Sequence, residues 1–413
     1  MSGNTLDRRE PVGAPLAPGE RLFALDVIRG FALLGILVMN LPDFSGAPRF
    51  FGGDTQAAWP LADRIADTVR SLFFDGKFNS LFSFLFALGF TIQLDRLQRS
   101  NSAGATKIYL RRLLVLFIFG VLHGCLLWPG DVLHVYAVLG LVLLAIRGFS
   151  DRTIFMLIAI SLSMPGLRSL ALLLLASPAA NQQRVDFLDG IERGRQIAFG
   201  QGSYGASVIE STRQFAAFYI NPTAWSMTLM WFFVFGTTML IGLLAGRWRW
   251  LQNYHDHVGA IRRLQWWSLA IGLATAGMAT VAESALDPKQ PSLVWVAYRI
   301  CYGLARVGIM LFYVSTIARM AHSARWQDLL KPLAAAGRLP LTNYLLQTVL
   351  CTTIFYHWGM GYWGKATPVT ELALAFGLFF LVQVPLSVLW LRHHRFGPME
   401  YLWRMLTYGR GSL

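Results

Sequence analysis

Charged residues are scarce in this chain. Asp, Glu, Lys and Arg make up 14% of its 413 residues, whereas a soluble domain carries about 25%. Together with 55% hydrophobic residues and a mean hydropathy of +0.47, this deficit excludes an ordinary soluble domain and indicates a membrane protein. Acidic residues are the scarcer kind, which leaves a net charge of +14. The basic residues lie between apolar runs, as the positive-inside rule requires, so we expect no nucleic-acid partner.

Several familiar signatures are also missing. The three cysteines lie inside apolar segments and form no CxxC pair, so neither a disulfide framework nor a metal site is indicated. The patterns GxxxxGK[ST], GxSxG and HExxH are absent, which leaves ATP-driven transport and zinc hydrolysis without support. We expect no metal cofactor. No cleavable signal is recognised, and the first apolar run is expected to insert the chain.

Long apolar runs dominate what is present. Ten segments have about the length of a membrane span, and the sequence therefore predicts an all-α polytopic membrane protein with about ten transmembrane helices. Pro165 and Pro385 are expected to kink the fifth and the tenth. The segments are 22–42, 78–94, 108–128, 131–147, 153–176, 223–246, 266–283, 293–318, 339–357 and 370–391.

The distribution of Lys and Arg predicts the orientation. With the N-terminus inside, the inner segments hold 22 of the 36 basic residues and the outer segments hold 10, so both termini are expected in the cytoplasm. The expected organisation begins with a disordered cytoplasmic tail and an N-terminal membrane half that carries the candidate catalytic helices. A polar extracytoplasmic loop with interfacial helices and a C-terminal membrane half with an interfacial tail follow. The four regions are 1–21, 22–176, 177–222 and 223–413.

The first apolar segment contains three unexpected polar residues. A charge near the middle of a bilayer costs roughly 2.5–3.5 kcal/mol, yet "LDVIRGFALLGILVMN" includes Asp26 and Arg29. These two residues are three apart and share one helix face, so they can form an ion pair. Asn40 ends the run at its outer side. The pair could line a polar route or join helices, and Asn40 could cap the helix.

The stretch "VLFIFGVLHGCLLWPGDVLHVY" is the richest in polar residues. The turn WPGD folds two segments into a hairpin, which should bring Asp131 to the level of His123. A buried imidazole beside a carboxylate is the arrangement of an oriented general base, and histidine's ordinary pKa of about 6.5 suits proton transfer. His134 and Tyr136 follow on the second segment. The alternative is a histidine that only joins helices by hydrogen bonds.

The ninth segment also carries polar residues, within "GRLPLTNYLLQTVLCTTIFYHWG". Asn343 and Gln347 are four apart and share a helix face, with Tyr344 next to them. Together with Tyr136, these residues are candidates for lining a substrate cavity. Hydrogen bonding between helices is the alternative.

Five blocks suggest a family. They are "ERLFALDVIRGFALLGILVMN", "GKFNSLFSFLFALGF", "GVLHGCLLWPGDVLHVYA", "GRLPLTNYLLQT" and "RFGPMEYLWRMLTY", in order from about residue 20 to 408. They resemble the YeiB-like family of bacterial inner-membrane proteins, whose C-terminal half is a domain of unknown function. The resemblance implies about ten spans, an inner-membrane location and a place in the transmembrane acyltransferase group. That group includes heparan-alpha-glucosaminide N-acetyltransferase and the membrane sugar O-acyltransferases.

One departure from that group concerns the catalytic histidine. The O-acyltransferases have an arginine, ten residues and then a histidine in the first span, and the matching positions here are Arg29 and Asn40. The glucosaminide enzyme is similar in having asparagine there, but adds a catalytic histidine in the following loop. This chain has no histidine before His123. We therefore take His123 as the candidate base, with Asp43 as a weaker one.

The resulting expectation is an acyltransferase that uses acyl-CoA, with acetyl-CoA as the expected donor. The CoA phosphates would meet inner basic residues, and Arg29 with Asp26 would line the route to the outer half. His123, oriented by Asp131, would take the proton of an extracytoplasmic hydroxyl or amine acceptor, a carbohydrate or glycolipid, and Asn40 would stabilise the oxyanion. A direct route and a route through acyl-histidine stay open. The basic residues are Arg111, Arg112 and Arg338.

A different class is a proton-coupled secondary transporter or a lipid or small-molecule flippase, in which Asp26, Arg29 and His123 form a relay. Such proteins often contain inverted repeats with broken helices at matching places, and the sequence shows no such symmetry. Membrane lipids are expected partners in either case, and a homodimer is compatible with the sequence.

Overall fold

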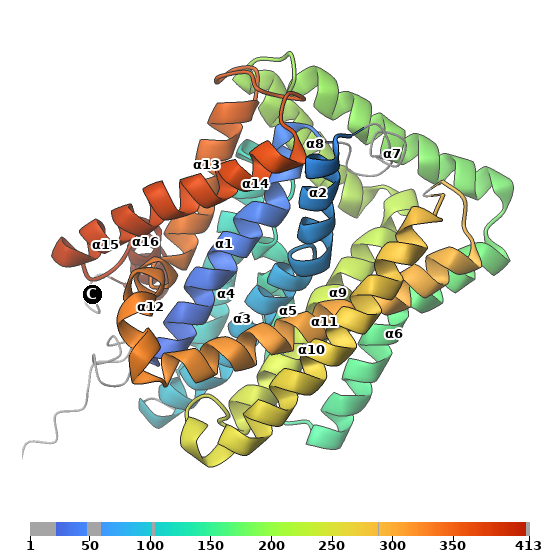
Figure 1. The fold of residues 1–413 in the computed structure, drawn as a ribbon. Coiled ribbons are helices and arrows are strands. Elements are labelled where there is room, and N and C mark those ends of the chain that lie inside the picture. The colour runs from blue at the N-terminus through green and yellow to red at the C-terminus, as the bar shows by residue number, and fades with distance from the viewer. Residues whose placement is uncertain (1–21, 48–58, 101–103, 288, 410–413) are drawn as a thin grey trace, which may run out of the picture.

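The computed structural model describes residues 22–47, 59–100, 104–287 and 289–409, and every regular element in these ranges is a helix (Figure 1). The predicted all-α class is confirmed for these residues, and the tail expected at 1–21 lies outside them. In chain order the helices are α1 (Phe23–Ser45), α2 (Leu61–Phe73), α3 (Lys77–Ser100), α4 (Ala105–Leu126), α5 (Leu133–Ile146), α6 (Asp151–Leu175), α7 (Pro178–Ala198), α8 (Tyr204–Ile220), α9 (Pro222–Arg247), α10 (Tyr254–Ser284), α11 (Leu293–Ala321), α12 (Ala324–Gly337), α13 (Pro340–Phe355), α14 (Pro368–Gly377), the π-helix η3 (Leu378–Gln383), α15 (Val384–His393) and α16 (Pro398–Tyr408).

Seven stretches of the described residues are helical, long and apolar enough to cross a membrane. They are α1, α2 together with α3, α4, α6, α9, α11, and α14 continued through η3 into α15. The ten apolar segments predicted from the sequence all fall on helices, and the other three lie on α5, α10 and α13. The chain is therefore a polytopic α-helical membrane protein.

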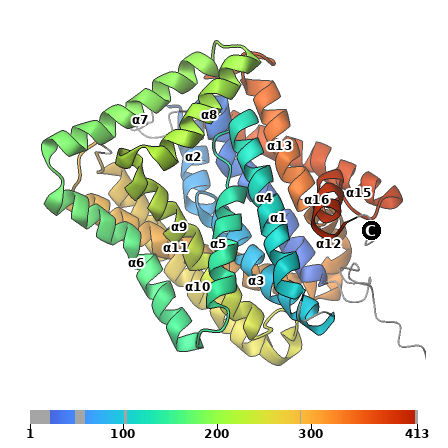
Figure 2. The ribbon, with the colours of Figure 1, turned by 180° about the vertical axis from the view of Figure 1, so that it is seen from behind.

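Helix α1 lies inside the bundle, with α3, α11, α12, α13 and α14 packed around it (Figures 1 and 2). Its residues Val27, Ile28 and Leu33 have no exposed surface. A helix that is apolar on all sides suits such a position. Because lipid tails are as apolar as these side chains, close packing rather than burial from water holds membrane helices together.

Helix α12 approaches α1 very closely at the end where α1 begins. A Cβ atom at Gly337 would lie 1.8 Å from the backbone oxygen of Asp26, so only glycine allows this approach. Small residues serve the same purpose at many membrane helix contacts. As a result, Arg338, which follows Gly337, is held beside the first turns of α1.

The polar stretch 177–222 forms the helices α7 and α8, which lie across one end of the bundle (Figures 1 and 2). Each has a serine at its N-cap: Ser177 Oγ accepts from the backbone N of Ala180 at 3.1 Å, and Ser203 Oγ accepts from the backbone N of Ala206 at 3.3 Å. Helix α8 packs on α4 and α9, which brings it against the hairpin formed by α4 and α5.

The last apolar segment contains a π-helix directly before its proline. Pro385 lacks a backbone N–H and cannot complete regular helical bonding, and η3 at Leu378–Gln383 is the local adjustment. Gln383, at the end of η3, is fully buried. Pro165 lies within the uninterrupted helix α6.

Candidate functional site

Asp131 lies between two histidines, and each carboxylate oxygen pairs with one imidazole. Asp131 Oδ1 is 2.9 Å from His123 Nδ1, and Asp131 Oδ2 is 2.7 Å from His134 Nδ1. The three residues are between 3% and 5% exposed. The hairpin therefore brings His123 and Asp131 together as the sequence predicted, and His134 joins them.

The turn between α4 and α5 positions these groups. The backbone N–H groups of Leu127 and Trp128 both bond to the carbonyl of His123, which closes α4 at its last turn. After the turn, Asp131 Oδ2 also accepts from the backbone N of His134 at 3.2 Å. Asp131 therefore satisfies one of the free N–H groups at the start of α5 while it holds both imidazoles.

The other nitrogen of each imidazole meets a hydroxyl group from a distant helix. Thr348 on α13 places its Oγ1 2.9 Å from His123 Nε2. Tyr219 on α8 bonds through its phenol to His134 Nε2. The Asp131 cluster, which we define as His123, Asp131, His134, Thr348 and Tyr219, thus joins four helices and the α4–α5 turn in one hydrogen-bond network.

The direction of these bonds follows from chemistry. An ionised carboxylate can only accept, so both histidines donate through Nδ1–H to Asp131. Each Nε2 is then a lone-pair acceptor, and the hydroxyls of Thr348 and Tyr219 donate to it. Burial and the nearby charge of Asp131 raise the pKa of the Tyr219 phenol above its ordinary value, which keeps this donor protonated at neutral pH. His123 is therefore arranged as a base with its Nε2 directed at a hydroxyl.

Aromatic side chains surround His123. Its ring centroid is 5.2 Å from that of Tyr344 and 6.4 Å from that of Trp128. The Trp128 indole N–H donates to Asp43 Oδ2 at 2.7 Å, and Asp43 also pairs with Arg195 at 2.8 Å. The C-terminal end of α1 therefore lies close to the Asp131 cluster, and Tyr344 is one predicted lining residue that contacts the candidate base.

Asn40 belongs to the same region. It precedes Asp43 by three residues and thus lies on nearly the same face of α1, and it is half-buried. Because Asp43 contacts Trp128 beside His123, the predicted oxyanion donor and the predicted base lie at the same end of the bundle.

The predicted cofactor residues lie at the opposite end of α1. Asp26 and Arg29 form an ion pair at 2.9 Å, as their spacing predicted. Arg338 follows Gly337, which touches the backbone of Asp26. The Arg338 Nε atom is buried without a hydrogen-bond partner. A buried guanidinium N–H without a partner fits a phosphate oxygen, because an unsatisfied buried donor is costly.

Arg111 and Arg112 lie near the start of α4, on the same side of the protein. Arg111 is exposed, and Arg112 stacks on Trp403 with its guanidinium carbon 3.8 Å from the ring centroid. The Trp403 indole also donates to the backbone oxygen of Arg112 at 3.1 Å. Arg111 is thus available to a soluble anion, whereas Arg112 helps to fix α16 on α4.

The remaining predicted lining residues form bonds between helices. Gln347 Nε2 donates to Leu33 O and to Gln383 Oε1, both at 3.0 Å. Asn343 Nδ2 donates to Ser387 Oγ at 3.0 Å. These amides join α13 to α1, η3 and α15, which is the alternative that the sequence left open.

Tyr136 has a similar position between helices. Its phenol donates to the backbone oxygen of Asn79 at 3.2 Å and lies 3.2 Å from Ser83 Oγ. Tyr136 therefore connects α5, two residues after His134, with the first turn of α3.

Sequence reasoning missed Thr348 and Tyr219. Thr348 follows Tyr344 by four residues and shares its helix face, so the same spacing argument could have included it. No local pattern identifies Tyr219, because it reaches His134 from a helix 85 residues further along the chain. Among the described residues, no group of three or more His, Cys, Asp or Glu side chains is arranged to hold a metal ion.

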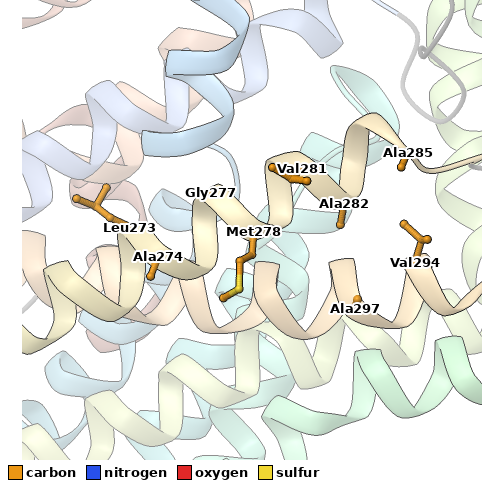
Figure 3. A pocket seen from close by; sticks show the side chains of 9 residues that line it. All are labelled: Leu273, Ala274, Gly277, Met278, Val281, Ala282, Ala285, Val294 and Ala297. Atoms are coloured by element: carbon orange, nitrogen blue, oxygen red, sulfur yellow. The ribbon is translucent and has the colours of Figure 1, made fainter.

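An apolar groove lies elsewhere, between α10 and α11 (Figure 3). It has a volume of about 620 Å³ and contains no residue of the Asp131 cluster. Its lining is aliphatic: Leu273, Ala274, Gly277, Met278, Val281, Ala282, Ala285, Val294 and Ala297. Such a surface suits contact with lipid tails and provides no chemistry.

Comparisons with known proteins find relatives that match almost the whole chain. Residues 245–410 match the family described as "Protein of unknown function (DUF418)". The uncharacterized protein YxaH of Bacillus subtilis is 32% identical, over 95% of this chain and 96% of its own length. The uncharacterized protein YeiB of Escherichia coli is 31% identical, over 94% and 96%. The chain belongs to the YeiB-like family.

Membership places the Asp131 cluster within the YeiB-like fold. The DUF418 region covers α10 to α16, and it supplies Thr348 and Tyr344. The histidines and Asp131 come from helices before it. The candidate site of this YeiB-like protein is therefore assembled from both parts of the chain.

Proposed function

We propose that this YeiB-like protein is a membrane-bound acyltransferase that moves an acyl group, most simply acetyl, from cytoplasmic acyl-CoA to an extracytoplasmic hydroxyl or amine acceptor such as a sugar or glycolipid. The proposal includes ten transmembrane helices, both termini in the cytoplasm and a location in the bacterial inner membrane. The observation that carries it is His123, whose Nδ1 is held by Asp131 and whose Nε2 faces a hydroxyl at 2.9 Å.

The proposed reaction uses this geometry. The acceptor hydroxyl takes the place of Thr348 Oγ1 at His123 Nε2 and gives its proton to that nitrogen. The acceptor oxygen forms a bond to the thioester carbonyl carbon, and the carbonyl oxygen becomes an oxyanion. When the intermediate collapses, the carbon–sulfur bond breaks and His123 returns the proton to the departing CoA sulfur. The products are the acylated acceptor and CoA.

The roles of the other residues match their positions. Asp131 fixes the tautomer and orientation of His123, as the carboxylate of a catalytic triad does. Asn40, at the same end of the bundle, would donate to the oxyanion, a contribution of about 2.7–4 kcal/mol to the barrier. Tyr344, whose ring is 5.2 Å from that of His123, would contact the bound acceptor.

The donor would bind from the other end of α1. Arg338, with its partnerless Nε, and exposed Arg111 suit the phosphates of CoA. The ion pair of Asp26 and Arg29 would lie along the path of the pantetheine arm. The cytoplasmic entry and the outer base are then separated by most of the length of α1, which is the distance an extended pantetheine arm must cover.

The deciding experiment uses the purified full-length protein in lipid nanodiscs with radiolabelled acetyl-CoA and a membrane-extract acceptor pool. Wild-type protein is expected to transfer the label and His123→Gln to lose at least 100-fold, while His393→Gln, at an exposed position outside the cluster, keeps full activity. Transfer that is equal in His123→Gln would remove His123 as the base. A wild-type protein that neither binds nor consumes acetyl-CoA, but carries protons across the membrane, would favour the transporter alternative.

A further inference from the structure

Helices α2 and α3 are separated by a sharp break beside the middle of α11. The break consists of Phe74, Asp75 and Gly76, and Gly76 adopts a φ of +71°, a conformation that favours glycine. The phenol of Tyr313, two thirds along α11, donates to the backbone oxygen of Phe73 at 2.8 Å. The break is therefore half-buried and held against α11.

Two cationic side chains are buried at this break. Lys77, the first residue of α3, and Arg306 of α11 are each 2% exposed. A Cβ atom at Gly76 would lie 3.2 Å from Arg306 Cδ and 2.3 Å from the phenol oxygen of Tyr302, so both α11 side chains pack directly on the break. Lys77 Nζ lies 5.5 Å from the centroid of the same Tyr302 ring.

The two cations differ in what they contact. Lys77 Nζ donates to the backbone oxygen of Ser71. Arg306 has two buried guanidinium nitrogens, Nε and Nη1, without a hydrogen-bond partner. Leaving a buried charged donor unpaired is among the costliest arrangements in a protein, and more so within a membrane. Arg306 thus has two donor nitrogens available for an anion.

The nearby carboxylates do not fill this role. Asp67 and Asp75 both pair with Arg70, which lies between them; the distance to Asp75 is 3.3 Å. Glu283 acts on Lys77 only through longer-range electrostatics, as Arg299 acts on Tyr302.

The start of α3 adds to the positive potential. This helix has 24 residues and no acidic residue in its first turn, so its N-terminus favours an anion; Asp75, two residues before the helix, is paired with Arg70 at 3.3 Å. Broken membrane helices whose half-helix N-termini point at anionic groups are known substrate sites in transporters. At the break itself, 29% of the Asp75 side chain is exposed.

We infer that the α2–α3 break is a binding site for one oxyanion group, the carboxylate or phosphate ester of a ligand that reaches the interior of the bundle. Arg306 donates to the anion through the nitrogens that have no protein partner, and Lys77 with the N-terminus of α3 supplies the remaining positive charge. Tyr136, two residues after His134, bonds to the backbone oxygen of Asn79, two residues after Lys77. The site does not depend on the acyltransferase proposal.

The test measures binding to the full-length protein in a neutral detergent by thermal unfolding. Oleate and dioleoyl phosphatidylglycerol represent lipid sources, acetate and inorganic phosphate represent soluble sources, and methyl oleate is the uncharged control. At least one anion is expected to raise Tm by several degrees, and methyl oleate is expected to have no effect. Whether the effective anion is one of the lipids or one of the soluble anions shows where the natural ligand comes from.

Two variants and a matched control decide the role of the cations. Arg306→Met is expected to weaken the effective anion at least ten-fold, and Lys77→Gln several-fold, while Arg262→Met, at an exposed site on α10, binds as wild type. Without ligand, Arg306→Met should be at least as stable as wild type, because it removes an unpaired buried charge. Three results would each overturn the proposal. They are a wild type whose Tm responds to no anion, an Arg306→Met variant that binds the anion as well as wild type, and a ligand-free Arg306→Met variant that is much less stable than wild type.

Discussion

Gly120 lies directly against Asp131. A Cβ atom at Gly120 would be 2.7 Å from Asp131 Oδ2 and 2.3 Å from the backbone N of His134. Gly120 precedes His123 by three residues and faces the same side of α4. The absence of a side chain at this position is therefore what lets the start of α5 approach α4 closely enough for one carboxylate to reach both imidazoles.

Gly120→Ala should separate the two helices at the cluster. Overpacking of this kind costs about 1–3 kcal/mol, so we expect a lower Tm together with a loss of acyl transfer of at least ten-fold. The control is Gly148→Ala, because a Cβ atom there would meet nothing within 4 Å. Thermal unfolding and the transfer assay measure both effects. If Gly120→Ala were as stable and active as Gly148→Ala, the close contact would be unimportant.

Asp131→Asn should cost more stability than a single hydrogen bond. Asp131 accepts from two imidazole N–H groups and one backbone N–H, and an asparagine can accept only through one oxygen while its NH₂ faces another donor. We expect a loss of about 2–4 kcal/mol and a transfer rate as low as that of His123→Gln. Unfolding in denaturant measures the loss of stability. An unchanged unfolding midpoint would show that the hydrogen-bond network contributes no net stability.

Thr348→Val separates two routes for the acyl group. In the direct route Thr348 only occupies the position of the acceptor hydroxyl, so the valine variant should keep transfer within about ten-fold. If Thr348 were itself acylated, the variant should lose about 1,000-fold or more. The measurement is single-turnover transfer, with a search for acylated Thr348 by peptide mass spectrometry. A trapped acyl-threonine would contradict the direct route.

Glu400 on α16 caps the first turn of α13. One carboxylate oxygen accepts from the backbone N of Leu341 at 2.7 Å and of Thr342 at 3.0 Å, and the other accepts from Thr342 Oγ1 at 2.5 Å. Glu400→Ala should lower stability by about 1–2 kcal/mol, whereas Glu400→Gln, which keeps an acceptor oxygen, should lose less. Equal losses in the two variants would rule out the capping role.

The same residue predicts a pH effect. Burial raises the pKa of Glu400 above its ordinary value, although the bonds from Thr342 and Leu341 oppose this. The folded protein therefore binds this proton more tightly than the unfolded chain does, so the stability linked to Glu400 is greatest at low pH and falls as the pH rises through its pKa. Tm measured against pH between 4 and 8 should fall less steeply in Glu400→Gln than in wild type. Identical slopes would contradict the assignment.

The sequence predicted the helices because length and apolarity determine them. Each of the ten apolar segments falls on a helix, since in a bilayer the backbone must satisfy its own hydrogen bonds. The packing of the α2–α3 break against α11 was not predicted. It depends on Tyr302 and Arg306 of α11, more than 200 residues away in the chain, and no local periodicity contains that information.

The candidate site was predictable to the extent that it is local. Asp131 and His123 are eight residues apart across a recognisable turn, and Asp26 and Arg29 share one helix turn. Thr348 and Tyr219 come from other helices, and their partners are set by packing. Asn343 and Gln347 were identified from the sequence, but their role was not. Polar residues on one helix face predict a cavity lining and a helix–helix contact equally well.

The cap at Glu400 ties the start of α13 to the C-terminal helix α16. Its first turn is held by the C-terminal helix, and six residues later, about 9 Å along the axis, Thr348 meets the imidazole of His123. A protein or lipid that lifted α16 away would release the near end of this rod and could shift the hydroxyl at its far part. A change in the position of the C-terminal helix would then alter the hydrogen bond at His123, although the two are separated by about two turns of α13.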